Sequence, residues 1–276
     1  ANYILAGASS GGIWKTIDGG LSWYNITDAS LNALSGTTGI NIIAVDPLHL
    51  DTMFAATGKV TGNKNNWGYS VGLIYTTNGG VHWQRDSNAD TVVAKQNDFW
   101  DANIQQLAYL PGTTKLLLAY KDSIYIKHNL QDVWHNITPA FDSAKVTDIK
   151  FTNSNPSKAL VKTSPRFGIS KLWILDNGIW SQQIIDLDTN VIYQKYTEEE
   201  NISLSLQDDV YLNIAKKTPG KLLVKHSLSN NTNTLLNTNM GNFQFIVVSP
   251  AHDSVFYATR HTGASGNDLL VSYNRG

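Results

Sequence analysis

The chain has 276 residues, of which 42% are hydrophobic and 16% are charged, and its formal net charge is −1. Its 21 Lys and Arg residues are scattered, which argues against the clustered basic surface that nucleic acids and anionic membranes require. The absence of cysteine excludes disulfides, thiolate metal sites and a thiol nucleophile. No run of eighteen apolar residues occurs, so we expect no membrane-spanning helix and no direct membrane insertion.

Short runs of β-branched, aromatic and aliphatic residues recur along the whole chain with turn residues between them, and no long helical period interrupts them. The runs form six groups, with three predicted strands in the first and last groups and four in each of the others. The groups span residues 3–27, 40–86, 104–138, 146–184, 201–237 and 243–276. This pattern predicts an all-β chain, a β-propeller of four-stranded antiparallel blades, in which residues 1–276 form one propeller domain or a portion of one.

The clearest turn lies in residues 11–23, GGIWKTIDGGLSW. An Asp-Gly turn between two β-rich runs predicts a hairpin, because glycine readily adopts the positive φ that such turns require. We expect the carboxylate of Asp18 to accept hydrogen bonds from the backbone of its own turn. Trp23, at the start of the second strand, is expected to fold back over the hairpin as an apolar lid.

The same pattern returns in residues 72–83 and 127–134, and a partial copy ends the chain. The first copy consists of Thr16, Asp18, Gly20, Ser22 and Trp23. The weaker copies keep Thr76, Asn78, Gly80 and Trp83, then Asn129 and Trp134, then Ser272, Asn274 and Gly276.

The first copy matches the full pattern S/T-x-D-x-G-x-S/T-W, and the weaker copies have asparagine at the aspartate position, so the chain resembles the Asp-box (BNR repeat) β-propellers. That superfamily includes sialidases, xyloglucanases and sortilin-type receptor domains, and the chain looks most like exported bacterial repeat proteins associated with type IX secretion. The resemblance implies that each box is a structural clamp between the third and fourth strands of a blade, facing away from the ligand. The first group lacks its innermost strand and the last group its outermost, so we expect the chain to be an arc of a ring of seven or more blades; a ring closed within this chain is the alternative.

Propellers carry selective residues on the loops of one face. We expect the first-to-second-strand and inter-blade connections to share the face opposite the box turns. Four connections with aromatic and polar residues, at 62–72, 90–101, 164–170 and 260–268, would bind a glycan or peptide by stacking and hydrogen bonding. The candidate ligand-binding residues are Asn63, Lys64, Trp67, Tyr69, Asp98, Phe99, Trp100, Arg166, Phe167, Arg260 and His261. Alternatively, Trp67 and Trp100 pack their own loops onto the blades.

Catalytic groups are harder to find. A sialidase-like site needs three arginines and a Tyr–Glu pair, but the only glutamates are the consecutive Glu198, Glu199 and Glu200. A xyloglucanase-like site needs two aspartates across a cleft, for which Asp98 and Asp101 are the candidates. The histidines and aspartates show no H-x-H or EF-hand spacing, so we predict no metal site and no cofactor.

Three functions therefore stay open: a non-catalytic binding or scaffolding propeller, a glycoside hydrolase, and a purely structural module of an adhesin or secretion machinery. Asp followed by Ser or Thr and an apolar residue, as at Asp51, Asp122 and Asp253, resembles a bacterial O-glycosylation signal. Together with the family resemblance, this predicts an extracellular or cell-surface location. We expect glycan or protein partners, no nucleic acid, and further domains in a larger parent chain.

Overall fold

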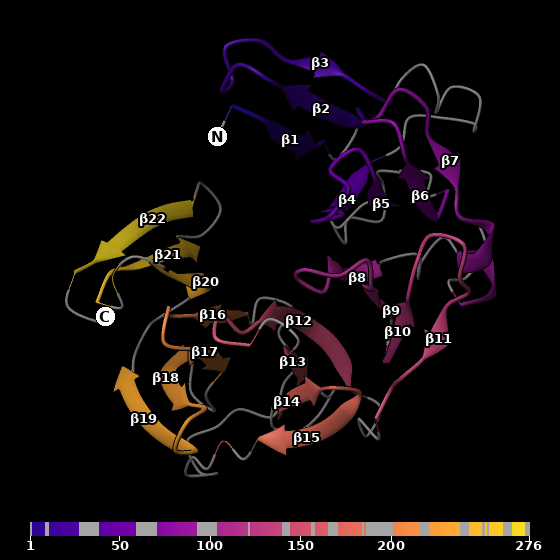
Figure 1. Ribbon diagram of the computed structural model, residues 1–276. Helices are drawn as coiled ribbons and strands as arrows, with labels where there is room; N and C mark the ends of the chain where they lie inside the picture. Colours follow the sequence, from indigo (N-terminus) through magenta and orange to yellow (C-terminus); the bar gives the residue numbers. More distant parts are fainter. Residues whose placement is uncertain are drawn as a thin grey trace. The chain divides into compact units, whose positions relative to one another are not determined.

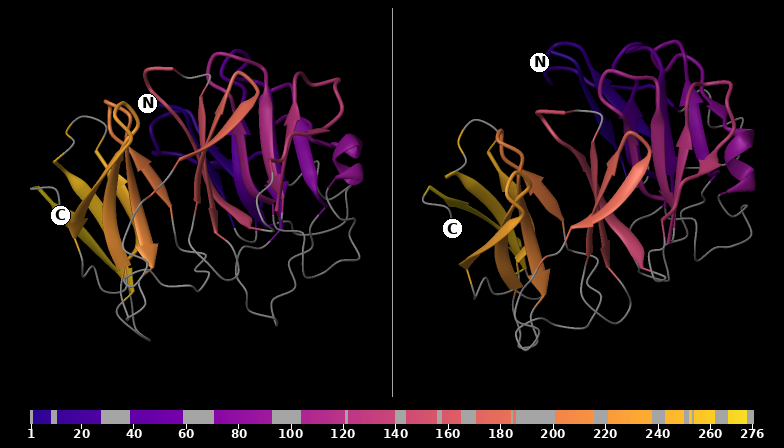
Figure 2. Two further views of the ribbon diagram at one scale, coloured as in Figure 1. Left: turned by 90° about the horizontal axis from the view of Figure 1, so that it is seen from below. Right: turned by 60° about the horizontal axis from the view of Figure 1, so that its bottom comes forward.

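The computed structural model describes residues 2–8, 11–27, 39–58, 71–92, 104–120, 122–139, 144–155, 158–164, 171–183, 185, 201–215, 221–237, 243–249, 252, 254–261 and 267–273. These residues contain 22 strands in six antiparallel sheets (Figure 1), which confirms the predicted all-β fold of propeller blades. The helix among them is the short 3-10 helix η2 (Ser87–Thr91), drawn as a coiled ribbon in Figure 2. No helix in the described part of the chain is long and apolar enough to cross a membrane.

The chain divides into two compact units, Ala1–Thr138 and Pro139–Gly276. The N-terminal unit contains blades 1 to 3. Blade 1 consists of β1 (Ile4–Gly7), β2 (Ile13–Thr16) and β3 (Tyr24–Asn25). Blade 2 consists of β4 (Ile40–Val45), β5 (Met53–Thr57), β6 (Leu73–Thr76) and β7 (Gln84–Arg85), and blade 3 of β8 (Ile104–Tyr109), β9 (Leu116–Tyr120), β10 (Ser123–Lys127) and β11 (His135–Asn136).

The C-terminal unit contains blades 4 to 6. Blade 4 consists of β12 (Lys145–Phe151), β13 (Ala159–Ser164), β14 (Lys171–Asp176) and β15 (Ile179–Gln183). Blade 5 consists of β16 (Ile202–Leu204), β17 (Asp209–Ala215), β18 (Lys221–Ser227) and β19 (Thr232–Asn237). Blade 6 consists of β20 (Phe243–Val248), β21 (Phe256–His261) and β22 (Asn267–Ser272). The strands follow the predicted order, whereas the predicted domain boundaries stay predictions.

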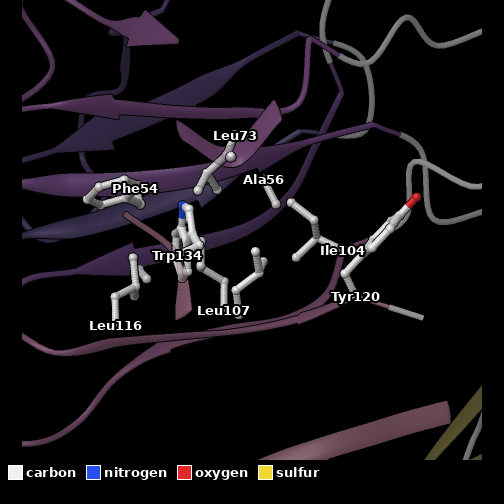
Figure 3. Close-up of a cluster of buried hydrophobic side chains, with 11 residues drawn as sticks. Phe54, Ala56, Leu73, Ile104, Leu107, Leu116, Tyr120 and Trp134 are labelled. Carbon is white, nitrogen blue, oxygen red and sulfur yellow. The ribbon is translucent and has the colours of Figure 1, made fainter. Parts of the chain in front are cut away.

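The core of each unit lies between neighbouring blades. The second strands β5, β9 and β13 are buried at every position, because both faces of a central blade strand are covered. Between blades 2 and 3, Phe54, Ala56 and Leu73 pack with residues of blade 3. Figure 3 shows Trp134 among Phe54, Leu107 and Leu116 in this cluster. Burying one such side chain contributes about 1.5–3 kcal/mol, so the clusters hold adjacent blades together.

The turns of blades 2 and 3 alternate between two ends. The backbone N–H of Gly79, in the β6–β7 turn, donates to the carbonyl oxygen of Asp51, in the β4–β5 turn, at 2.9 Å. In blade 3, Thr114 Oγ1 from the β8–β9 turn donates to the carbonyl oxygen of His128 at 2.9 Å. The expectation that first-to-second-strand connections lie opposite the box turns was therefore wrong. In an antiparallel succession of four strands, the first and third turns share one end of the sheet.

The connections predicted to carry ligand residues are second-to-third-strand or inter-blade connections. Residues 62–72 lie between β5 and β6, and residues 165–170 lie between β13, which ends at Ser164, and β14. Residues 90–101 join blade 2 to blade 3, although Asp90 still belongs to η2. The segment 260–268 is shorter as a loop than expected, because Arg260 and His261 belong to β21 and pair with Asp268 and Asn267 of β22.

Candidate functional site

The three box turns are the Asp-box copies at residues 16–23, 76–83 and 127–134. In the first box turn, Thr16 Oγ1 accepts from the backbone N–H of Gly20 at 3.0 Å and donates to Asp18 Oδ1 at 2.7 Å. The backbone N–H of Ser22 donates to Asp18 Oδ1 at 2.9 Å, and Ser22 Oγ donates to Asp18 Oδ2 at 2.5 Å. These bonds from Ser22, followed by the one from Thr16, hold the pKa of Asp18 well below its usual value. As expected, the carboxylate binds its own turn.

Trp23 completes this turn. Its indole Nε1 donates to the carbonyl oxygen of Gly20 at 3.2 Å, and the residue is 39% exposed. The predicted lid over the hairpin is confirmed for this copy. The bond closes within three residues of sequence, so local chain geometry is enough to form it.

The second box turn replaces the carboxylate with an amide and keeps the same pattern. Thr76 Oγ1 donates to Asn78 Oδ1 at 2.9 Å and accepts from the backbone N–H of Gly80 at 3.2 Å. The backbone N–H of His82 donates to Asn78 Oδ1 at 2.9 Å. Trp83, however, is buried and its Nε1 donates to the carbonyl oxygen of Ile26 in blade 1 at 2.9 Å. This lid therefore binds the preceding blade.

The third box turn is rebuilt around a buried lysine. Lys127 stands where the other turns have threonine, and its Nζ donates to the carbonyl oxygen of Asp132 and lies 3.8 Å from Asp86 Oδ2. Burial lowers the pKa of Lys127, and the negative charges of Asp86 and Asp132 oppose this effect. Trp134 Nε1 donates to Asp86 Oδ2 at 3.0 Å, so this lid also binds the preceding blade.

A cavity of about 280 Å³ lies between blades 2 and 3 at the end where the box turns are. Its lining residues are Asp46, His49, Thr52, Phe54, Tyr109, Thr114, Leu116, Lys127, Asn129, Leu130 and Gln131. Phe54 and Tyr109 contribute aromatic rings with centroids 6.4 Å apart. This cavity is slightly smaller than typical small-molecule sites, which measure about 300–1,000 Å³. Sequence reasoning missed it, because its walls come from segments far apart in the chain.

The polar groups of the cavity are held by the surrounding turns. Asp46 Oδ1 accepts from the backbone N–H groups of Leu48 at 2.8 Å and His49 at 3.2 Å. Burial, followed by the charge of Asp46, raises the pKa of Tyr109 well above its usual value, so the phenol stays protonated. The cavity therefore offers an aromatic wall beside a fixed carboxylate and a neutral hydroxyl.

Three metal-ligating side chains meet on the third box turn. His128 Nδ1 lies 2.9 Å from Asp132 Oδ2, and His135 Nε2 lies 3.1 Å from Asp132 Oδ1. One ligand atom from each residue lies within 4.8 Å of the other two. The search for H-x-H and EF-hand spacing missed this group, since its members are four and three residues apart across a turn and a strand.

Most of the predicted ligand-binding residues fall outside the described part of the chain. They are Asn63, Lys64, Trp67, Tyr69, Asp98, Phe99, Trp100, Arg166 and Phe167. Asp101, Glu198, Glu199, Glu200, Asn274 and Gly276 also lie outside it. The backbones of Arg260 and His261 lie in β21, and Ser272 ends β22. The ligand surface on these loops stays a prediction.

The sequence matches no protein-family model and no curated protein sequence. Solved β-propeller structures are nevertheless similar to it. A GH74 enzyme from Niastella koreensis matches with a TM-score of 0.68 and 15% identity, over 100% of this chain and 43% of that one. The GH74 xyloglucanase from Xanthomonas campestris matches with a TM-score of 0.68 and 16% identity, over 100% and 42% of the two chains.

A third similar structure is the extracellular domain of a protein from B. thetaiotaomicron that is described as a one component system. It matches with a TM-score of 0.60 and 13% identity, over 99% of this chain and 31% of that one. This chain thus spans less than half the length of these three proteins. At these identities the similarity establishes the β-propeller fold.

Proposed function

We propose that this chain is a non-catalytic binding or scaffolding propeller of an exported or cell-surface bacterial protein, with Asp-box architecture. The proposal rests on one observation: the polar side chains of the first two box turns form hydrogen bonds within their own turns. Thr16, Asp18 and Ser22 bind one another and the turn backbone, and Thr76 and Asn78 repeat the arrangement. Polar groups that bond to one another stabilise the scaffold, so we expect other loops to bind the ligand.

We propose that the ligand binds the connecting loops at the end opposite the box turns. The sequences of these loops contain Trp67 and Trp100 together with amide, carboxylate and basic residues such as Asn63 and Lys64. Aromatic faces stack on sugar rings or apolar side chains, while polar groups fix orientation by hydrogen bonds. We therefore propose a glycan or a peptide as the ligand. The similarity to an extracellular domain supports a location outside the cell.

Binding of the full chain to glycan and peptide arrays tests this proposal. We expect at least one binder whose signal falls when Trp67→Ala and Trp100→Ala are combined. Trp14→Ala is the matched control, because Trp14 is a 39% exposed tryptophan on β2, outside the proposed loops. Absence of any binder, or equal binding by the double variant and the control, would remove the ligand part of the proposal.

Glycoside hydrolysis is the second candidate, because two of the similar structures are GH74 enzymes. In this chain it would depend on Asp98 and Asp101 as an acid and a base across a cleft. It predicts release of reducing sugar from a β-glucan or sialoside, and loss of that release in Asp98→Asn. A substrate panel without turnover leaves the binding proposal in place and ends this one.

A structural module of an adhesin or a type IX secretion component is the third candidate. It predicts that the native protein is recovered with protein neighbours from cell envelopes and binds no free glycan. Intact mass of the exported protein tests the glycosylation that this route implies. A mass equal to that of the bare polypeptide would contradict that modification.

A further inference from the structure

We propose that His128, Asp132 and His135 form a binding site for a divalent metal ion such as Zn²⁺. The three residues lie at the β10–β11 turn of blade 3: His128 directly follows β10, and His135 opens β11. Two imidazoles and one carboxylate are a common ligand set for Zn²⁺, whose fourth position is then filled by water or by a group of a partner. The proposal is independent of the proposed glycan or peptide binding.

The distances fit a shared ion. The three ligand atoms lie within 4.8 Å of one another, and both histidines already face the carboxylate of Asp132. The rings of His128 and His135 are 5.4 Å apart between centroids and inclined by 61°, so they do not stack against each other. Zn–N and Zn–O bonds of about 2.0–2.2 Å place tetrahedral ligands roughly 3.3–3.6 Å apart. Small rotations of the two half-exposed imidazoles would reach that spacing.

The backbone holds the central ligand in place. The backbone N–H of His128 donates to Asp132 Oδ2 at 3.1 Å, and that of Val133 donates to Asp132 Oδ1 at 2.9 Å. His135 is fixed by strand pairing, where it lies opposite Ile126. Bonds of this kind orient a metal ligand before the ion binds, which reduces the ordering cost of binding.

The local charge also suits a cation. Asp132 supplies a carboxylate that faces both imidazoles, and its negative charge attracts a cation. Lys127 is the nearby positive charge, but its Nζ contacts the main-chain oxygen of Asp132 and lies beside Asp86. Asp86 therefore offsets part of the charge of Lys127, although Lys127 still interacts electrostatically with Asp132.

A purely structural role would have Asp132 accept one hydrogen bond from each histidine. Metal binding differs chemically, because both imidazole nitrogens that face Asp132 must lose their protons and donate lone pairs to the ion. The two roles are separated by measuring metal binding directly, and the His–Asp pair of His49 and Asp46 provides a comparison. His49 Nδ1 lies 3.3 Å from Asp46 Oδ2, and the group of three ligands identified among the described residues does not include it.

The test is calorimetric titration of the full chain, without an affinity tag, with Zn²⁺ at neutral pH. We expect saturable binding of one ion per chain. His128→Asn and His135→Asn should each weaken it by at least about tenfold, whereas His49→Asn should bind as the unchanged protein does. Both cluster histidines are nearly half exposed, so these variants should fold, and circular dichroism without metal checks this.

Co²⁺ provides a second readout that does not depend on heat. Its visible absorption should show coordination by nitrogen and oxygen in the unchanged protein and in His49→Asn, and should lose it in His135→Asn. Absence of saturable binding would overturn the proposal. So would binding that survives in a His128→Asn and His135→Asn double variant, or a loss that His49→Asn shares.

Discussion

The indole Nε1 of Trp134 in blade 3 donates a hydrogen bond to Oδ2 of Asp86 in blade 2 at 3.0 Å. Both residues are buried, and Asp86 also receives a backbone hydrogen bond from Asn88 at 3.1 Å. Trp134 therefore links two blades through its polar atom while its ring joins the hydrophobic cluster between them. Trp83 likewise links blade 2 to blade 1, because its indole Nε1 donates to the carbonyl oxygen of Ile26.

Trp134→Phe should destabilise the N-terminal unit by about 1.5–3 kcal/mol, because a buried carboxylate loses a hydrogen-bond donor. Trp23→Phe is the matched control, since Trp23 donates to a carbonyl oxygen of its own turn and is 39% exposed. We expect the control to cost less than about 1 kcal/mol. Urea unfolding followed by circular dichroism measures both; equal losses would contradict the inter-blade role of Trp134.

Gly80→Ala should be more destabilising than Gly20→Ala, although both glycines have a positive φ, of 94° and 100°. A Cβ at Gly80 would lie 2.5 Å from Ile26 Cδ1, whereas a Cβ at Gly20 would meet Trp23 Nε1 at 3.8 Å. The left-handed backbone costs an alanine roughly 1–2 kcal/mol at either site. Overpacking adds about 1–3 kcal/mol at Gly80 alone.

Comparison of the two variants by thermal and urea unfolding isolates the effect of the neighbouring blade. A larger loss for Gly20→Ala would show that turn conformation dominates. It would also contradict close packing of the second box turn on Ile26.

Asp18→Asn should lower the thermal midpoint at neutral pH, and the gap to the unchanged protein should shrink below about pH 4. The folded-state pKa of Asp18 lies below its usual value because the hydrogen bonds from Ser22 and Thr16 favour the carboxylate. Such a group stabilises the fold above its unfolded-state pKa, and this stability is lost as pH falls through the folded-state pKa. Scanning calorimetry over a pH series measures the gap. A gap that stays constant into strong acid would show that the charge of Asp18 contributes nothing.

Asp148→Asn should show the opposite pH dependence. Asp148 Oδ2 accepts from the backbone N–H of Ile202 in blade 5 at 2.8 Å, and burial raises the pKa of its carboxyl above the usual value. A raised folded-state pKa means that the protonated form stabilises the fold at low pH and that this stability is lost as pH rises through the folded-state pKa. The variant cannot ionise. Its free energy of unfolding relative to the unchanged protein should therefore be most favourable near neutral pH and fall toward about pH 4.

The slope with pH is the test for Asp148→Asn, because the amide also changes the hydrogen bond from Ile149 and the ion pair with Lys150. Those interactions favour the ionised form of Asp148 and oppose the effect of burial on its pKa, so the slope reports which effect dominates. Urea unfolding at a series of pH values gives the slope directly. A difference that rises with acid would contradict burial as the dominant effect on Asp148.

The hydrogen bonds within the box turns could be predicted because their partners are neighbours in sequence. Asp18 and Ser22 are four residues apart, so the motif fixes their contact wherever the hairpin forms. The partners of Trp83 and Trp134 could not be predicted, since they lie 57 and 48 residues earlier. The cavity between blades 2 and 3 could not be predicted either, because its walls also come from residues far apart in the sequence. The His128, Asp132 and His135 group escaped because a turn brings together residues whose spacing matches no simple metal motif.

The sequence by itself determined the strands, their grouping into blades and the internal bonding of the first two box turns. These features depend on alternating hydrophobicity, turn residues and contacts over a few residues, which one stretch of chain can specify. Tertiary structure alone decided which blade each lid tryptophan binds and where the cavity lies. Those relationships arise only when separate segments pack, because burial selects partners by shape and unsatisfied polar groups rather than by position in the chain.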